Sequence, residues 1–488
     1  MKHDPIAIPQ PTLVQRALGG HAALGLLAGG LLYLIALSGM LVVIGERWQR
    51  WEQPAVAESA VMSPDAVQAA VATKAAIDRG KPASTHLYVK MPTADLPRTV
   101  VTSDHGAIYV DRDGQSAGAE AHAWTEFLIN LHTYLHLPMT VGIILVGALG
   151  VMLAALAVTG VVAHPRIIRD AFRLRARGNR QLAQADWHNR LGVWTLPFVV
   201  TLALTGAIIG LSSVGADLLG KRYFGGDTLA AYGPIFGEEH PVDKRPAPLP
   251  DVAAPLRHMA AAFPAATPTY VTIHDPATRG QNIQLLADHQ RRLIYGEAYH
   301  FDAAGRYEGR LGLSDGPLGR QAAASLYNLH FGKFGGLPIQ LAYIAFGLAL
   351  CVVTATGMSL WLQKRRRRGL PSPHLEGFWT MVVWATPVLV VASLWLRAVG
   401  GAGMPLVPAF WIGLAGAVAL GVAAPRLADA RVLRMLLAAM LVVTAITHFV
   451  LTPLDRPAIW AIDLALLGIA FVLFAVEVMR AAPRPVAA

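Results

Sequence analysis

The sequence of 488 residues is poor in cysteine and in charged side chains. Its single cysteine, Cys351, excludes a disulfide framework, a cysteine zinc site and an iron–sulfur cluster. It also excludes a Cys-x-x-Cys-His motif, so a covalently attached haem is ruled out. Only 15% of the residues are charged and 54% are apolar, whereas a soluble globular protein carries roughly 25% charged residues. This composition argues against an ordinary water-soluble enzyme and against a disordered chain.

The sequence also lacks a nucleotide-binding signature. No Gly-x-Gly-x-x-Gly follows a stretch with strand character, and the loops on the predicted cytoplasmic side are too short for a dinucleotide-binding domain. A nicotinamide or flavin domain within this chain is therefore not expected. The formal net charge of +10 reports basic loops of a membrane protein, so no nucleic-acid partner is expected.

Long apolar runs are abundant. Eight of them reach the roughly 20 residues that cross a bilayer, near 20–45, 137–163, 191–213, 337–362, 377–398, 405–424, 432–452 and 458–480. The first run is too long for the core of a signal peptide, and no small-residue cleavage site follows it, so we expect it to remain as a helix. The sequence predicts an integral membrane all-α bundle of about eight transmembrane helices, in contact with lipid.

Basic residues indicate the orientation of these spans. An arginine-rich loop joins spans two and three, span four ends in the run Lys364–Arg368, and further arginines lie between spans six and seven. Short loops rich in Lys and Arg stay in the cytoplasm, so all three lie on one side if both termini are cytoplasmic. The long polar segments 46–131 and 214–329 then face the opposite compartment. Topology and lipid headgroups are enough to explain these basic runs.

The first half of the chain contains an internal duplication. In span one, His21 is followed by Leu-Gly at +3 and +4 and by a hydroxyl residue and Gly at +17 and +18; span three repeats this spacing from His188. Spans two and four each follow an Asn-Leu-His that ends at His132 or His330, and each later contains Thr-Gly. Both polar segments begin with an Ala-rich helical stretch and continue with strand-like alternation.

The repeated unit is therefore helix, small α+β domain, helix. We divide the chain into the first helix (1–45), a first polar domain (46–131), spans two and three (132–213), a second polar domain (214–329), span four (330–368) and an added four-helix bundle (369–488).

The histidines gather at two depths. His21, His164 and His188 fall at the cytoplasmic ends of spans one to three, and His132, His136 and His330 fall at the opposite ends of spans two and four. The glycines four and eighteen residues after His21 and His188 share the helix face of these histidines, so they are expected to clear space beside them. Neutral imidazoles are common haem ligands, and two on one iron suit electron transfer. The pattern predicts two haems, each held by two histidines.

Matched positions in two repeats lie at equal depth, which pairs His21 with His188 and His132 with His330. His136 is one turn from His132 and is an alternative ligand. His164 could replace His21 or form a further site. His132 and His164 are 32 residues apart, about 48 Å along one continuous helix, which is long for a single electron step. His448 has no repeat partner, and a hydrogen-bonded core histidine is the simpler interpretation there.

At these residues the sequence resembles the PepSY-associated transmembrane family, which includes iron-regulated inner-membrane proteins and ferric-siderophore reductases. The resemblance covers roughly residues 15–368. Its motifs are the opening His-x-x-Leu-Gly span that ends in Ser38-Gly39, and the stretches Leu131-His132, Thr159–His164, Asp186–Gly192, Leu329–Phe334 and Trp361.

The resemblance implies four core helices with two periplasmic PepSY-like domains in the bacterial inner membrane. It implies two non-covalent b-type haems and reduction of a ferric siderophore in the periplasm. Because the chain offers no nucleotide-binding domain, electrons would come from quinol or from a separate donor protein. The resemblance does not indicate which siderophore is the substrate. The last four spans are additional to those of the shortest family members.

Two other functions compete with a reductase. Eight spans with internal repeats also suit an iron or siderophore transporter subunit, although the two repeats here start on the same side. Helices broken within the membrane would also favour a transporter. The prolines that could break a helix are instead expected near span ends or in early turns: Pro138, Pro197 and Pro338. The second alternative is a regulatory membrane protein without redox activity, acting through its PepSY-like domains.

Overall fold

The computed structural model describes residues 10–170, 180–237, 243–289, 292–401, 403–452 and 457–481. Within these ranges, seven helices are long and apolar enough to cross a membrane. They are α1 (Leu13–Val42), α5 (Met139–Ala163), α13 (Gly336–Arg367), α14 (Pro373–Gly400), α15 (Leu406–Ala423), α16 (Ala430–Leu451) and α17 (Pro457–Ala481). The prediction of a multi-pass helical membrane protein is confirmed.

The remaining predicted span is broken. Helices α7 (Arg180–Trp194) and α8 (Leu196–Gly210) pass the length and hydropathy test only together, and they are bent by 63° at Thr195. Pro197 in the first turn of α8 lacks an N–H and crowds the preceding turn, which explains the bend. Pro197 lies in an early turn, as expected, but the span predicted over 191–213 is broken at this turn.

His132 also lies on a different helix from span two. Helix α4 (Ala123–Tyr134) ends where Leu135 and His136 adopt left-handed backbone conformations, with φ of 54° and 55°, and α5 starts three residues later. Gly142 permits this tight turn, since a Cβ there would lie 2.2 Å from the Tyr134 carbonyl oxygen. The 48 Å separation assumed a continuous helix and is corrected by this break.

The second repeat makes the corresponding turn with glycines. Helix α12 (Leu318–Phe331) is followed by its C-cap, Gly332. Gly335 is the N-cap of α13, and Gly336 is its first residue. All three glycines have positive φ. Glycine adopts this conformation without steric cost. The two copies therefore reach the same turn with different residues.

The two polar segments form one sheet. Its eight strands run in the order β4-β3-β2-β1-β5-β6-β7-β8, with neighbours antiparallel. The first segment supplies β1 (His86–Lys90), β2 (Thr99–Ser103), β3 (Gly106–Val110) and β4 (Ser116–Ala119); the second supplies β5 (Ala266–His274), β6 (Asn282–His289), β7 (Glu297–Phe301) and β8 (Tyr307–Arg310). The halves join where β1 pairs with β5, from His86 opposite His274 to Lys90 opposite Tyr270. The expected two small domains thus share one sheet.

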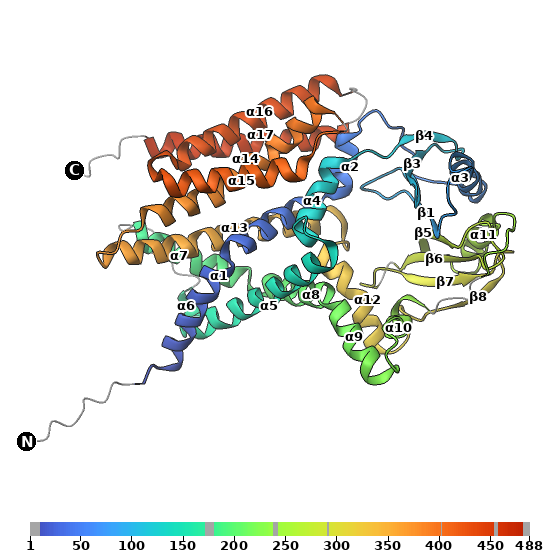
Figure 1. Cartoon of the computed structure of the whole chain (residues 1–488), viewed down its shortest axis with the longest axis horizontal. Helices are drawn as coiled ribbons and strands as arrows, with labels where there is room; N and C mark the ends of the chain where they lie inside the picture. Colours follow the sequence, from blue (N-terminus) through green and yellow to red (C-terminus); the bar gives the residue numbers. More distant parts are fainter. Residues whose placement is uncertain are drawn as a thin grey trace, which may run out of the picture.

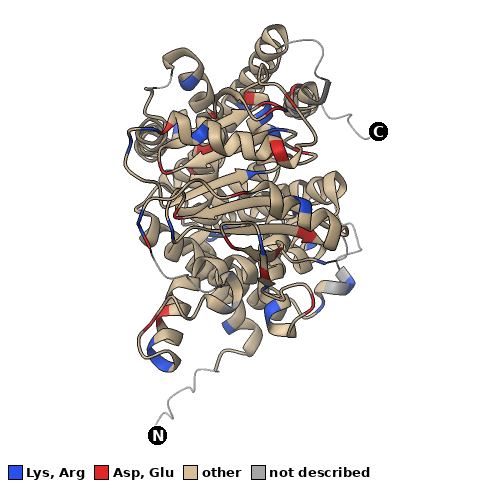
Figure 2. Cartoon of the chain, turned by 90° about the vertical axis from the view of Figure 1, so that its right-hand side faces the viewer, with Lys and Arg blue, Asp and Glu red and all other residues tan. Residues whose placement is uncertain are grey.

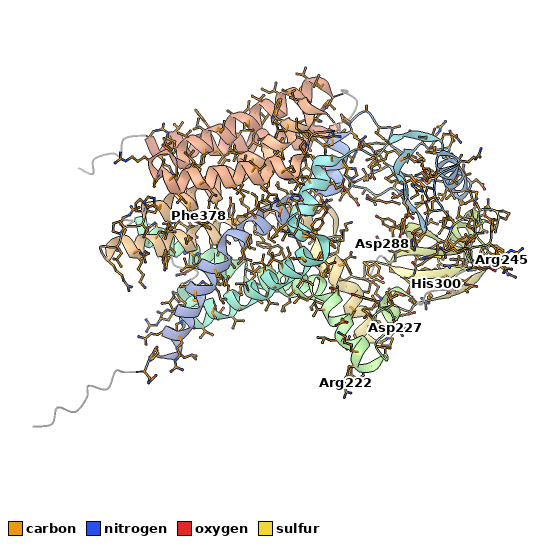
Figure 3. The ribbon with its side chains drawn as sticks, in the orientation of Figure 1. Arg222, Asp227, Arg245, Asp288, His300 and Phe378 are labelled. Atoms are coloured by element: carbon orange, nitrogen blue, oxygen red, sulfur yellow. The ribbon has the colours of Figure 1, made fainter. Side chains whose placement is uncertain are left out.

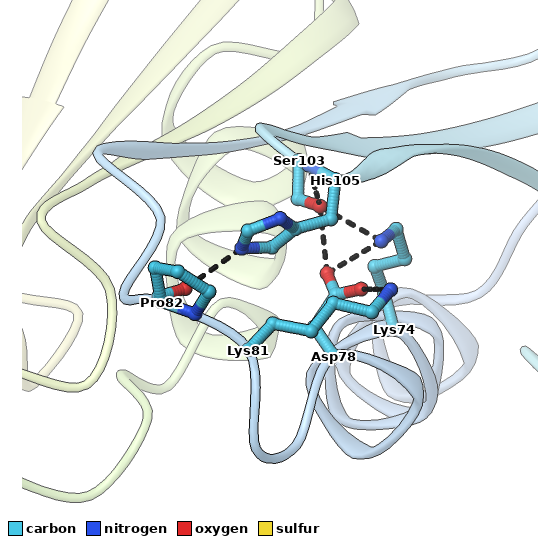
Figure 4. Close-up of polar contacts among 6 residues, drawn as sticks. All are labelled: Lys74, Asp78, Lys81, Pro82, Ser103 and His105. Carbon is cyan, nitrogen blue, oxygen red and sulfur yellow. Dashed lines mark hydrogen bonds and ion pairs between the residues drawn. The ribbon is translucent and has the colours of Figure 1, made fainter.

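One face of this sheet is covered by α3 (Pro64–Ile77) and α11 (Ala253–Ala262), which lie on the side away from the long helices (Figure 1). Val67, Val89, Val271 and Leu285 are fully buried there in one apolar core that draws on both halves. A polar cluster fixes α3 to β2, because Lys74 Nζ donates to Ser103 Oγ at 2.7 Å and also binds Asp78 (Figure 4).

Burial alone would raise the pKa of the Asp78 carboxyl. Hydrogen bonds from Lys74, Ser103 and Lys81 outweigh burial and hold this pKa well below its usual range. Lys74, Ser103 and Asp78 therefore satisfy one another's polar groups and stabilise the contact between α3 and β2. Lys, Arg, Asp and Glu residues are interspersed over this end (Figure 2).

The added helices α14 to α17 lie side by side as a bundle next to α1 and α13 (Figure 1). Two indoles attach it to the core: Trp379 Nε1 of α14 donates to the Ala355 carbonyl, and Trp124 Nε1 of α4 donates to the Val390 carbonyl. The connecting helices are α2 (Gly45–Glu52), α6 (Ile167–Asp170), α9 (Ser212–Tyr223), α10 (Gly233–Phe236) and a 3₁₀ turn (Pro425–Leu427).

Candidate functional site: two histidine pairs

Four of the predicted histidines form two pairs. His21 of α1 faces His188 of α7 with ring centroids 6.4 Å apart, and His132 of α4 faces His330 of α12 at 6.2 Å. We call them the inner pair (His21 and His188) and the outer pair (His132 and His330); the outer pair lies at the end of the helices that carries the sheet. The structure thus brings together the same partners that the sequence repeat predicts.

The same hydrogen bonds fix each imidazole. His21 Nδ1 lies 3.1 Å from the Leu156 carbonyl oxygen, and His188 Nδ1 lies 3.0 Å from that of Val353. His132 Nδ1 lies 3.0 Å from the Ile35 carbonyl oxygen, and the backbone of Leu202 bonds His330. A carbonyl oxygen can only accept, so Nδ1 carries the proton and Nε2 keeps its lone pair. Each imidazole is therefore in the tautomer that can bind a metal through Nε2.

A hydroxyl three residues after each carbonyl completes the contact. Nδ1 of the four histidines lies 3.3, 3.2, 3.5 and 3.0 Å from the side-chain oxygens of Thr159, Thr356, Ser38 and Thr205. Each hydroxyl donates its own proton to the carbonyl four residues earlier in its helix, so its oxygen is left to accept. One arrangement of helix carbonyl and hydroxyl is therefore used four times.

The glycine after each hydroxyl makes room for the ring. An added Cβ would lie 2.7 Å from His132 Cε1 at Gly39 and 2.8 Å from His330 Cε1 at Gly206; at Gly160 and Gly357 the distances to His21 and His188 are 3.3 and 3.1 Å. These glycines lie on the neighbouring helix. By contrast, a Cβ at Gly192 would meet nothing within 4 Å, and one at Gly25 would meet Leu156 at 4.0 Å. The prediction that a glycine of the same helix clears the space is wrong.

The separation of the rings fits one iron between two imidazoles. An imidazole nitrogen binds a first-row transition metal at about 2.0–2.1 Å, and the ring centroid lies about 1.1 Å behind it, so opposed ligands put their centroids about 6.3 Å apart. Both observed separations, 6.4 and 6.2 Å, agree with this value. In the described part of the chain, no three His, Cys, Asp or Glu residues are grouped to hold an ion. Two histidines alone suit a metal whose other ligands come from a macrocycle.

Comparison with known proteins identifies the family. A family model described as PepSY-associated TM region matches residues 19–364, more than half of the chain. The chain belongs to the PepSY-associated TM region family. An uncharacterised protein of Pseudomonas aeruginosa is 26% identical over 353 residues, which make up 62% of this chain and 86% of the relative.

Helix α1 gives the distance between the two pairs in this family member. It carries His21 of the inner pair and, eighteen residues later, Gly39 that packs on His132 of the outer pair. A rise of 1.5 Å per residue puts these levels about 27 Å apart. The two pairs therefore lie near opposite ends of the helical core.

The alternative ligand His136 has a different environment from His132. Its Nε2 donates to the Phe127 carbonyl at 2.9 Å, and its Nδ1 accepts from Trp411 Nε1 at 3.3 Å, so both ring nitrogens are used. Its ring stacks on Phe127 with a centroid separation of 4.7 Å. These contacts hold the left-handed turn between α4 and α5 and explain why a histidine occupies it. His164 lies at the C-terminal cap of α5.

His448 joins the added bundle to the core. Its Nδ1 lies 2.9 Å from Asp463 Oδ2, its Nε2 donates to the Trp51 carbonyl at 2.9 Å, and its ring stacks on Trp51 at 4.1 Å. Asp463 also accepts from Trp51 Nε1 at 2.9 Å. His448 is half-buried and both of its ring nitrogens are hydrogen-bonded, which agrees with the simpler interpretation of a hydrogen-bonded core residue.

Charged residues connect the outer pair to the sheet. Lys333, three residues after His330, lies 3.7 Å from Glu46, and Lys90 of β1 lies 2.9 Å from the same carboxylate. Burial would raise the pKa of Glu46, but Lys90 and Lys333 outweigh it and hold that pKa at about 2. Burial, together with the neighbouring His132, lowers the pKa of His330 to about 4. His330 is therefore neutral at pH 7, as metal binding requires.

The face of the sheet toward the helices carries further polar groups. Figure 3 places Asp288 there, whereas Arg245 lies at the far end of the molecule. Burial raises the pKa of Asp288, and Lys333 opposes this shift. The side of the sheet that faces the helices therefore contains charged groups of both signs.

Sequence reasoning missed the role of the four hydroxyl-Gly pairs. They are visible in the sequence as Ser38-Gly39, Thr159-Gly160, Thr205-Gly206 and Thr356-Gly357. The sequence contains four repeat-matched histidines and four hydroxyl-Gly pairs. This equal number is the signal that could have assigned one pair to each histidine. Which histidine meets which pair depends on helix packing, and that was not available from spacing alone.

Proposed function

We propose that this protein is a di-haem reductase of the bacterial inner membrane that passes electrons to a ferric siderophore, or a similar ferric chelate, in the periplasm. The observation that carries this proposal is the four-fold repeated histidine environment, which leaves Nε2 free at two pairs spaced for one iron each. The siderophore is the substrate class that the sequence resemblance implies.

His21 and His188 would hold one b-type haem, and His132 and His330 the other. Each haem, when bound, supplies an iron that cycles between the ferric and ferrous states by single electrons. The chain's own residues keep the proton on Nδ1, orient each ring and exclude water from the apolar interior. Such second-shell hydrogen bonds fix ring orientation and raise ligand basicity.

In the proposed topology, electrons would enter at the end of the helices that carries His21 and His188 and would leave at the end that carries His132 and His330, beside the sheet. The donor would be membrane quinol or a separate donor protein.

We expect both chain termini in the cytoplasm and the whole eight-stranded sheet in the periplasm. Reporter fusions at residues 80 and 280 should be active with alkaline phosphatase, which folds only after export. Fusions after residue 369 should be active with a cytoplasmic reporter and serve as the control. A cytoplasmic reporter that is active at either position in the sheet would contradict this topology.

The reductase activity has a direct test. Purified protein reduced with dithionite, freed of excess reductant and kept without oxygen should be reoxidised by a ferric siderophore, with loss of the reduced haem bands. The iron-free siderophore is the control and should leave the bands unchanged. Failure of every ferric siderophore or chelate tested to reoxidise the reduced protein would overturn the proposed reaction.

A transporter subunit remains the second candidate, because the broken α7–α8 span is a feature that transporters share. Colour separates it from the reductase: protein purified from haem-sufficient cells should show a Soret band and split reduced bands. Colourless protein would favour the transporter, or a regulatory protein that acts through its PepSY-like segments.

A further inference from the structure

A cavity of about 300 Å³ lies between α1 and α13, at the end of these helices that is opposite the sheet. The two helices pack closely near the sheet, where a Cβ added at Gly347 of α13 would lie 3.1 Å from Met40 Cβ of α1. They have separated at Gly19, because a Cβ added there would meet nothing within 4 Å. The cavity is therefore the wide end of a wedge between the two helices.

One face of each helix lines this cavity. Helix α1 contributes Gln15, Leu18, Gly19 and Ala22, and α13 contributes Trp361, Lys364, Arg365 and its C-cap Arg368. In both sets the second, third and fourth residues lie three, four and seven positions after the first, which places each set on a single helix face. Three basic side chains of α13 thus meet a strip of α1 that carries no charge.

These three basic residues have no counter-charge in the part of the chain that the structure describes. None of them forms an ion pair there, whereas the adjacent Arg366 binds Glu376. The facing helix contains no Asp or Glu from Leu13 to Val42. The cavity therefore presents positive charge, which attracts an anion.

Arg365 is held at the cavity by neutral partners. Its guanidinium carbon lies 5.0 Å from the centre of the Trp361 ring, and its Nε donates to Ser372 Oγ at 3.0 Å. Neither partner neutralises the charge, which is therefore available to a ligand. Trp361 itself is a residue type that is enriched where the apolar and polar parts of a membrane meet.

The combination of charge and apolar surface indicates which anion fits. Leu18 and Ala22 add apolar surface to the lining, and Leu18 is 50% exposed. A free phosphate ion would use only the basic residues, and a neutral quinol would use only the apolar ones. An anionic phospholipid uses both, and basic pockets between transmembrane helices suit such headgroups.

Only the second repeat builds this surface. Counted from the matched Gly160 and Gly357, the end of α5 at Ala163 corresponds to Leu360, so α13 continues for seven further residues to Arg367. The positions that match Lys364 and Arg365 are isoleucines in the first repeat. A basic face on an extended helix is therefore not a general requirement of the repeated unit.

We propose that this cavity binds the phosphate headgroup of an anionic phospholipid. Lys364, Arg365 and Arg368 bind the phosphate, and the acyl chains follow the apolar groove between α1 and α13. The lipid fills the wedge and so stabilises the contact between these two helices. This inference goes beyond the proposed reductase and does not depend on haem.

Lipid titration tests the role of the charges. Full-length protein, freed of lipid in a neutral detergent, is titrated with short-chain phosphatidylglycerol, and bound lipid is counted by native mass spectrometry. Zwitterionic phosphatidylcholine of the same chain length should bind more weakly. In the double variant Lys364→Gln/Arg368→Gln the affinity for phosphatidylglycerol should fall about thirtyfold, because two basic residues near the headgroup are lost.

The double variant Arg367→Gln/Arg426→Gln is the matched control. It removes two charges from exposed residues at the same end of the helices, and neither residue lines the cavity. It should bind phosphatidylglycerol like wild type.

A second pair of variants changes the shape of the cavity and leaves every charge in place. Gly19→Leu puts a side chain into the cavity, whereas Gly20 does not line it, so that Gly20→Leu is the control. An added Cβ meets nothing within 4 Å at either glycine, and leucine favours a helix more than glycine does, so both variants should fold. We expect Gly19→Leu to lose tight binding of phosphatidylglycerol and Gly20→Leu to keep it.

Other occupants of the cavity give different results. An excess of inorganic phosphate should not displace bound phosphatidylglycerol; displacement would mean a site for a free anion and would overturn the proposal. Equal affinities for the two lipids, or unchanged binding in either Lys364→Gln/Arg368→Gln or Gly19→Leu, would also overturn it. Binding of a short-chain quinone in place of phosphatidylglycerol, lost in Gly19→Leu, would assign the cavity to quinol and contradict the proposal as well.

Discussion

Alanine in place of His188 or His330 is expected to remove one of the two haems and leave the other in place. In the proposed function each histidine would supply one of the two imidazoles that hold a haem, and alanine offers no replacement. The haem content, measured as pyridine haemochrome per polypeptide, should fall by about half. His21→Ala and His132→Ala should each reproduce the loss seen with the partner of the pair, so that four variants fall into two spectral classes.

The two alternative ligands are the controls for this experiment. His136→Ala and His164→Ala should retain both haems, because His136 has both ring nitrogens hydrogen-bonded within the protein and His164 lies at the end of α5. His136→Ala is expected to lower thermal stability instead, since its ring holds a left-handed turn. Full haem content in His188→Ala or His330→Ala would refute the pairing.

Alanine in place of Gly39 or Gly206 is expected to weaken the outer haem almost as strongly as loss of a ligand. The new methyl group would lie 2.7 or 2.8 Å from a ring carbon of His132 or His330, closer than such atoms can approach, so the imidazole must move off its carbonyl and hydroxyl partners. Disturbing the groups that orient a metal ligand typically weakens metal binding 10–100-fold. Titration of the apoprotein with haem should show this loss at the outer site only.

Gly192→Ala is the matched control, because an added Cβ there meets nothing within 4 Å. It should bind both haems normally, and alanine favours the helix more than glycine does. Gly160→Ala, at 3.3 Å from His21, should give an intermediate loss at the inner site. A stronger effect at Gly192 than at Gly39 would show that the same-helix glycine, not the one on the neighbouring helix, makes room for the ring.

The features of this fold that could be predicted from the sequence are those that depend on local patterns of apolar residues and on the internal repeat. The long apolar helices were predictable because each run of about 20 residues has only one stable state in lipid. The break at Thr195 was harder to predict, because a proline in the first turn of a helix is normally tolerated. In addition, α7 begins further toward the N-terminus than the hydropathy of the sequence indicates. Repeat symmetry correctly paired His21 with His188, since equal sequence positions imply equal depth.

Long-range packing accounts for what was missed. The strands of 46–131 and 214–329 show the alternation of separate small domains, yet pairing of Val89 with Val271 joins them. An edge strand does not reveal its partner in its own sequence. Gly25 and Gly39 both follow His21 on one face, and only packing shows that Gly39 serves a histidine of another helix.

The seam between β1 and β5 has a consequence for biosynthesis. His86 pairs with His274 and Lys90 with Tyr270, so each partner follows 180 to 188 residues later in the chain. At roughly 5–20 residues per second, β1 waits about ten to forty seconds for the strand that completes it. During that interval two further membrane helices must be inserted, and β1 remains an open edge on which another chain could add a strand. Production of this protein should therefore be limited by aggregation of half-made chains rather than by the stability of the finished molecule.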